Sequence, residues 1–155
     1  MIVRLVLATV VAAALLGAAM PVVEDARHDA SATQADRETR AIADAITHVG
    51  RSTDPVPPGV PGGERVVTVD IPAEATVTVG SGPNGSDLDG SDSDVVSYVV
   101  GDVTSDRVPV PVDTRVAAGD DVLPDEQGLV LSGTERVVVR HVLVDGRPTV
   151  VVDRV

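Results

Sequence analysis

Residues 5–23 read LVLATVVAAALLGAAMPVV, an uncharged apolar run that lies between Arg4 and the acidic residues Glu24 and Asp25. A helix rises about 1.5 Å per residue, so this run would form a helix of about 30 Å, the thickness of a bilayer core. Arg4 and the amino terminus are expected to stay on the cytoplasmic side. The run therefore predicts a single-pass helix in the cell membrane, with the C-terminal part of the chain outside.

A cleavable signal peptide is the alternative for the same run. Residues 17–19 read Gly-Ala-Ala, and such small residues are typical of a signal peptidase site. Two features favour an uncleaved anchor. Pro21 would lie just past the cut, and the helical pattern continues beyond it.

The segment 24–50 has the periodicity of an amphipathic helix that extends the apolar one. Charged residues fill most of its faces, and Asp36 and Arg40 form an acid-before-base pair at i,i+4 spacing. Gly50 is expected to cap its C-terminus. The predicted apolar stripe, which would pack on a partner or on the chain's own head, consists of Ala26, Ala30, Thr33, Ile42, Ala45, Ile46 and Val49.

A linker and a β-rich head follow the helix. Residues 51–63, RSTDPVPPGVPGG, are too rich in Pro and Gly for a helix or a central strand. From 64 to 155 the chain predicts a small antiparallel β domain, a sandwich or open barrel, with a hairpin turn at Asp145-Gly146. The expected strands are 65–71, 75–79, 95–100, 108–112, 129–131, 136–144 and 149–152. The fold class is therefore α+β, with parts 1–23, 24–50, 51–63 and 64–155.

The composition indicates a salt-adapted protein. The net charge is −12, all 12 basic residues are Arg, and Asp outnumbers Glu. In molar salt the Debye length falls to about 3 Å, so the repulsion within such a surface largely disappears. A merely acidic soluble protein is the alternative. Binding to nucleic acid is not expected, because phosphates require basic patches.

Few residues point to chemistry. The chain has no Cys, which excludes disulfides, thiol catalysis and thiolate metal sites. His28, His48 and His141 show no paired metal spacing, and the best hydrolase candidate, His141 with Asp145 four residues later, has no convincing Ser partner. We therefore expect no enzyme activity and no cofactor.

The acidic segment 86–94, SDLDGSDSD, is a weak candidate for calcium binding. Its carboxylates alternate with small residues, but the spacing does not match an EF-hand loop, and a solvated acidic loop is the alternative. Asn84 begins an Asn-Gly-Ser acceptor for N-glycosylation, also a weak signal because such triplets arise by chance. The candidate ligands are Asp87, Asp89, Asp92 and Asp94.

The stretch ALLGAAMPVVEDAR, residues 14–27, resembles the N-terminal helix of type IV pilins and pseudopilins. Pilins share the apolar helix, a Pro at the place of Pro21, a polar helical continuation, a linker and a β-rich head. Arg4 lies near the place where pilins carry a Glu, so the resemblance favours an accessory pilin-like protein. The chain also resembles short uncharacterised haloarchaeal membrane proteins with one N-terminal helix.

Two functions remain open from the sequence. The first is a structural or interaction protein, a membrane-anchored pilin-like component of a surface filament or secretion assembly. Its helix would pack against other pilin-like or assembly proteins through Ala13, Gly17 and the bend at Pro21. The alternative is a secreted or anchored β-domain that binds a ligand or an envelope component.

Overall fold

The computed structural model describes residues 2–57, 59–80, 95–101, 103–119, 121–124 and 127–155. Within the helix and one strand, it leaves out the side chains of residues 2, 4, 5, 12, 13, 15–19, 21, 22 and 103–105. The described chain begins with one long helix, α1 (Ile2–Ser52). The strands that follow are β1 (Glu64–Ile71), β2 (Ala75–Val79), β3 (Val95–Val100), β4 (Val103–Pro109), β5 (Thr114–Ala118), β6 (Asp121–Val122), β7 (Leu129–Leu131), β8 (Gly133–Val144) and β9 (Arg147–Arg154).

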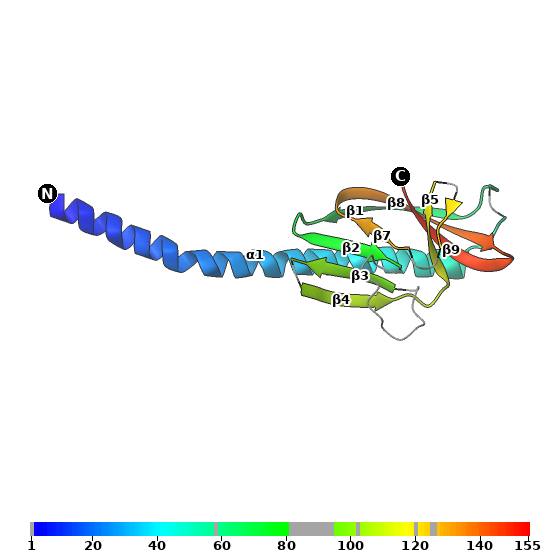
Figure 1. Ribbon diagram of the computed structural model, residues 1–155, viewed down its shortest axis with the longest axis horizontal. Coiled ribbons are helices and arrows are strands. Elements are labelled where there is room, and N and C mark those ends of the chain that lie inside the picture. Colours follow the sequence, from blue (N-terminus) through cyan, green and yellow to red (C-terminus); the bar gives the residue numbers. More distant parts are fainter. Residues whose placement is uncertain (1, 58, 81–94, 102, 120, 125–126) are drawn as a thin grey trace.

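The helix α1 gives the molecule its elongated shape. Its N-terminal part projects away from the β strands, and its C-terminal part lies among them (Figure 1). The last turn of the helix is closed by Thr53, whose backbone N–H and hydroxyl both donate to the carbonyl of Val49, at 3.2 and 2.7 Å. Pro55 follows, and the residue before a proline disfavours helical geometry.

Gly50 is not the C-terminal cap that its place in the sequence suggested, because α1 continues past it to Ser52. A β-carbon at Gly50 would lie 2.9 Å from Val112 Cγ1 and 2.9 Å from Val150 Cγ2. Gly50 therefore serves close packing between the helix and the head.

The predicted apolar stripe of 24–50 divides between two faces of α1. Ile42, Ala45, Ile46 and Val49 are buried as expected, but Ala26, Ala30 and Thr33 are exposed. Each of the two groups follows a helical period by itself. Across residues 34–41, however, a helix with 3.6 residues per turn rotates so far that the two groups lie on opposite sides.

The strands form two sheets. One has the order β1-β8-β9-β5-β6, and the other has the order β4-β3-β2-β7. The pairing is antiparallel except between β5 and β9, which run parallel. The prediction of an antiparallel head is therefore wrong at this pair. β9, the last strand of the chain, lies in the interior of its sheet, between β8 and β5.

Six of the seven expected strands lie within observed ones, whereas 108–112 does not, and β5 and β6 were not predicted. β2, β3 and β7 have the predicted bounds, and the turn between β8 and β9 lies at Asp145-Gly146, where φ is positive at both residues. The predicted strand 108–112 is wrong, because β4 ends at Pro109 and β5 begins only at Thr114. Pro109 and Pro111 lack the N–H that a continuous strand needs.

The core joins the helix to both sheets. Ile42 and Ile46 of α1 are fully buried in one cluster with Val77 and Val96 of the four-stranded sheet and Val139 of the five-stranded sheet. The chain has no Phe or Trp, so Val, Ile, Leu and Ala fill most of this core. The C-terminal part of α1 is therefore a structural part of the head.

Candidate interaction surface

The N-terminal part of α1 carries most of the exposed large apolar side chains among the described residues. Val3, Leu7 and Val10 are 80%, 64% and 60% exposed, and Met20 is 67% exposed. Large apolar side chains at such exposure, gathered on one element, mark a site that another molecule or a membrane covers. The Ala and Leu residues of this part favour a helix here without any support from the head.

The three residues proposed for helix packing lie on this projecting part. α1 is helical through Ala13, Gly17 and Pro21, whose side chains are outside those that the structure describes. Over the described residues, α1 does not combine the length and the apolar character that a membrane-spanning helix requires.

Hydrogen bonds join one side of α1 to the adjacent turns where the helix enters the head. The Ser31 hydroxyl bonds to the Glu74 carboxylate, and Gln34 Nε2 donates to the Asp70 carbonyl at 2.6 Å. The Gly101 N–H donates to the Glu74 carbonyl at 2.9 Å, which ties the β3–β4 turn to the β1–β2 turn. These bonds lie at the boundary between the buried part of α1 and its projecting part.

His141 is buried at the other end of the head, where the segment after α1 folds onto β8. Its Nδ1 lies 2.7 Å from the carbonyl oxygen of Thr53, and because a carbonyl only accepts, this nitrogen carries a proton. Val56 forms a parallel bridge beside Val142, with bonds of 3.2 Å to the His141 carbonyl and 2.9 Å from the Leu143 N–H. His141 thus holds the chain after α1 against the sheet.

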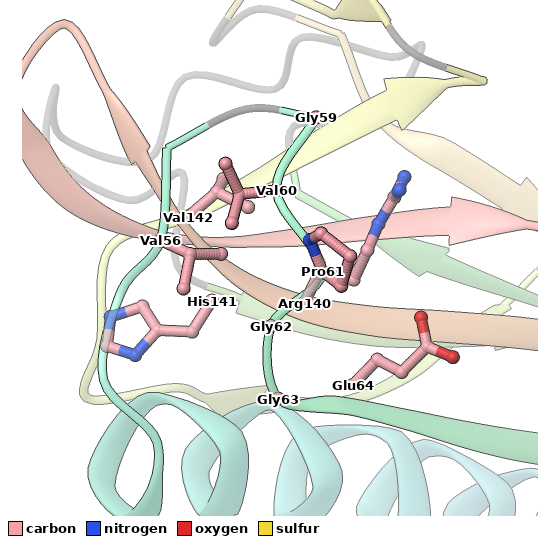
Figure 2. Close-up of a pocket in the computed structure, with 10 residues that line it drawn as sticks. All are labelled: Val56, Gly59, Val60, Pro61, Gly62, Gly63, Glu64, Arg140, His141 and Val142. Carbon is pink, nitrogen blue, oxygen red and sulfur yellow. The ribbon is translucent and has the colours of Figure 1, made fainter.

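A cavity of about 290 Å³ lies between this segment and β8 (Figure 2). Figure 2 shows the Pro- and Gly-rich chain arching over β8, with the His141 ring beside the start of the arch. None of the described residues that line it is a Ser or Cys nucleophile. Its residues are Val56, Gly59, Val60, Pro61, Gly62, Gly63, Glu64, Arg140, His141 and Val142.

The other histidines lie on α1. His48 Nδ1 is 3.4 Å from the Ser52 hydroxyl, one turn later on an exposed face of the helix. His28 lies near the β3–β4 turn, with Cε1 3.9 Å from where a β-carbon of Gly101 would lie. Asp145 is exposed in the β8–β9 turn, and no hydrogen bond or ion pair joins it to His141.

Tyr98, the single aromatic residue, lies beside a small charged cluster. Burial raises the pKa of its phenol above the ordinary value, and the carboxylates of Asp36 and Asp106 raise it further, while Arg40 opposes them. Arg40 Nε is 2.9 Å from Asp36 Oδ1, as the i,i+4 spacing predicted. This cluster joins α1 to β3 and β4.

The candidate metal ligands Asp87, Asp89, Asp92 and Asp94 lie outside the described residues, as does Asn84. Over the part of the chain that the structure describes, no three His, Asp or Glu side chains gather as a metal site would require.

A family model described as a domain of unknown function, DUF7311, matches residues 2–155. The chain belongs to the DUF7311 family. No curated protein and no solved structure matches it. The DUF7311 match spans α1 together with every described strand, which agrees with a core that the helix and both sheets build jointly.

Sequence reasoning missed how much of the DUF7311 helix belongs to the head. Ile42, Ile46 and Val49 are larger and more apolar than Ala26 and Ala30, and this change in side-chain size along the helix was the available signal. The burial of His141 had no sequence signal beyond its alternation with buried Val137 and Val139 on β8.

Proposed function

We propose that this chain is a pilin-like, membrane-anchored component of a surface filament or secretion assembly in a salt-adapted cell. The single observation that supports this is the division of α1. One end is buried in a β-rich head, and the other projects from it with exposed Val, Leu and Met side chains.

The projecting part needs an apolar environment for a physical reason. Moving a Val or Leu side chain out of water gains about 1.5–3 kcal/mol, and residues 5–23 contain many such side chains. A bilayer, or the helices of neighbouring chains, would supply that burial. With Arg4 before the run and Glu24 after it, the proposed orientation places the head outside the cell.

Fractionation of native membranes tests the anchor. The full chain is expected to stay with membranes after washes with high salt and carbonate, and external protease should degrade the head in intact protoplasts. A soluble form that begins near Met20 would contradict the anchor and favour the alternative, a secreted β-domain that binds a ligand or an envelope component.

Assembly through the helix needs a separate test. Ala13→Leu with Gly17→Leu adds bulk where small residues would let helices approach closely. This double variant should still enter the membrane but should lose crosslinks to neighbouring proteins. Val6→Leu with Val10→Leu is the matched control, because it keeps large apolar residues in place. Equal crosslinking by both variants would contradict assembly through this face.

A further inference from the structure

The four-stranded sheet has an outer face that carries little charge. Its side chains alternate, so that Val77 and Val96 are buried toward α1 and every second residue points outward. Figure 1 shows β4, β3 and β2 side by side along α1. We call the outward side chains of this sheet the sheet face. Its described members are Thr76, Thr78, Val95, Ser97, Val99, Arg107, Pro109 and Val130.

The register of the strands places the single charge of these members at one end of a row. Ser97 of β3 lies directly opposite both Arg107 of β4 and Thr78 of β2, and Val130 of β7 lies opposite Thr78. Directly opposed residues of antiparallel strands share one side of a sheet, so this row crosses all four strands. Arg107 belongs to the edge strand β4. The centre of the sheet face, around Ser97 and Thr78, is therefore uncharged.

The five-stranded sheet shows that outward strand positions in this head do accept charge. On β1 and β8 these positions include Glu64, Asp70, Arg136 and Arg140. Strand propensity alone does not explain the difference, because both sheets are rich in Val and Thr. Charged residues are depleted at the centre of protein interfaces. The sheet face has this character, on a chain with 24 Asp and Glu residues.

We propose that the sheet faces of two copies pack against each other across a two-fold axis that runs along the membrane normal. This inference rests on the proposed anchor, which holds both copies in one orientation and at one depth. A two-fold axis brings the same patch of both copies together without any displacement along α1, so both apolar runs stay in the same bilayer. Arg107 lies at the rim of the contact, where it stays in water.

A second copy is the partner that suits this surface. A charged partner would have to bury its charges unpaired against Thr, Ser and Val side chains, which is unfavourable. The sheet face of another copy offers the same uncharged, β-branched surface. Two copies that each carry −12 also repel one another, so an uncharged face is where they can approach most closely.

The size of the sheet face makes this contact depend on the membrane. β2, β3 and β4 have five, six and seven residues. With strands about 4.8 Å apart and about 3.3 Å per residue, the four strands cover about 300 Å². A stable complex in solution buries about 800 Å² per partner. Anchoring in one bilayer raises the effective concentration of the heads and so favours a contact of this size.

The head contact is distinct from packing between the apolar helices. Packed sheets lie about 10 Å apart, and α1 lies behind the sheet in each copy. The two helices of such a pair are therefore held apart, and packing through Ala13 and Gly17 would involve a different neighbour. The two contacts together would link copies into a continuous row.

Crosslinking of full-length chains in native membranes tests the head contact, since the natural chain has no Cys. Thr78→Cys places a thiol at the centre of the sheet face, and a short bismaleimide should convert this variant to a covalent dimer. Thr68→Cys is the matched control, because Thr68 is an exposed outward residue of the five-stranded sheet. The control should give little dimer.

Inserted charge tests whether the uncharged centre is required. In the Thr78→Cys background, Ser97→Glu should lower the dimer yield by about tenfold or more, because each pair would bury two unpaired carboxylates. Thr76→Arg, with the opposite charge, should also lower it. Thr68→Glu changes the net charge equally and should leave the yield unchanged. Protease resistance of the head identifies the variants that are folded.

Three results would overturn the contact: equal dimer yields from positions 78 and 68, a folded Ser97→Glu or Thr76→Arg variant with unchanged yield, or crosslinks from position 78 only to a different protein. Carbonate extraction is scored separately in the same membranes. A chain that resists extraction but gives no dimer from position 78 would leave the anchor standing and refute the contact. A chain that is extracted yet gives this dimer would contradict the anchor and support the contact.

Discussion

Gly50 of α1 lies so close to Val150 of β9 that a β-carbon at position 50 would stand 2.9 Å from Val150 Cγ2. The same β-carbon would stand 2.9 Å from Val112 Cγ1. A helix interior ordinarily disfavours glycine, and at position 50 glycine allows the helix to lie this close to Val112 and Val150.

Gly50→Ala should therefore destabilise the head although alanine favours helices. Overpacking costs about 1–3 kcal/mol, and the gain in helix propensity returns only about 1 kcal/mol. Urea unfolding in molar salt measures the difference. In a Val112→Ala background the same change should cost less, because one of the two close contacts is gone. An equal cost in both backgrounds would show that packing at Val112 is not the cause.

The head should not fold without its share of α1. Residues 24–155 are expected to unfold cooperatively, whereas 64–155 alone should give no cooperative transition, because Ile42, Ile46 and Val49 supply one side of the core. Circular dichroism melts distinguish the two fragments. Adding a synthetic peptide of residues 31–52 to the shorter fragment should restore structure. A cooperative melt of 64–155 alone would contradict this role of the helix.

Salt should stabilise residues 24–155. This fragment lacks Arg4 and so carries a formal charge of −13, one more negative than the chain's −12. Screening of that self-repulsion is largely complete at about 1 M salt. The midpoint of thermal unfolding should rise between 0.1 and about 1 M KCl, where the Debye length falls from roughly 10 to 3 Å. A midpoint that stays constant or falls would contradict adaptation to salt.

Tyr98 gives a clean spectroscopic probe, since no other aromatic residue absorbs. Its phenol should ionise above its ordinary pKa, because burial disfavours the phenolate and the charges of Asp36 and Asp106 oppose it. A raised folded pKa means that its contribution to stability is present below the unfolded pKa, about 10, and is lost as pH rises through the folded value. Absorbance near the phenolate band measures the titration.

Two further titrations separate the causes of the raised pKa of Tyr98. Asp36→Asn should lower the pKa of Tyr98 part of the way, because burial, the larger cause, remains. In denaturant the shift should disappear altogether. A folded-state titration at the ordinary value would mean that the phenol is solvated.

Much of the fold follows from local sequence. The apolar periodicity predicted α1, and Asp145-Gly146 predicted the turn between β8 and β9. β2 and β3 were recovered with their exact bounds. These features depend on neighbouring residues, because helix periodicity and turn conformations are set by side chains a few positions apart.

The candidate surfaces were predicted less completely. The exposed apolar run was evident from composition, and the projecting part of α1 agrees with it. The open side of α1 within the head was not evident, because Arg37, Asp44 and Arg51 share one exposed side only when the sheets cover the other side of the helix.

The sequence by itself determined that a long helix precedes a Val-rich β region, and that the chain is strongly acidic. Only the tertiary structure decided which side of the helix is buried, that Gly50 serves packing instead of capping, and that β9 lies parallel to β5. The physical reason is distance along the chain. Gly50 meets Val150, and Thr53 meets His141, through close packing and hydrogen bonds between segments with no local signal for each other.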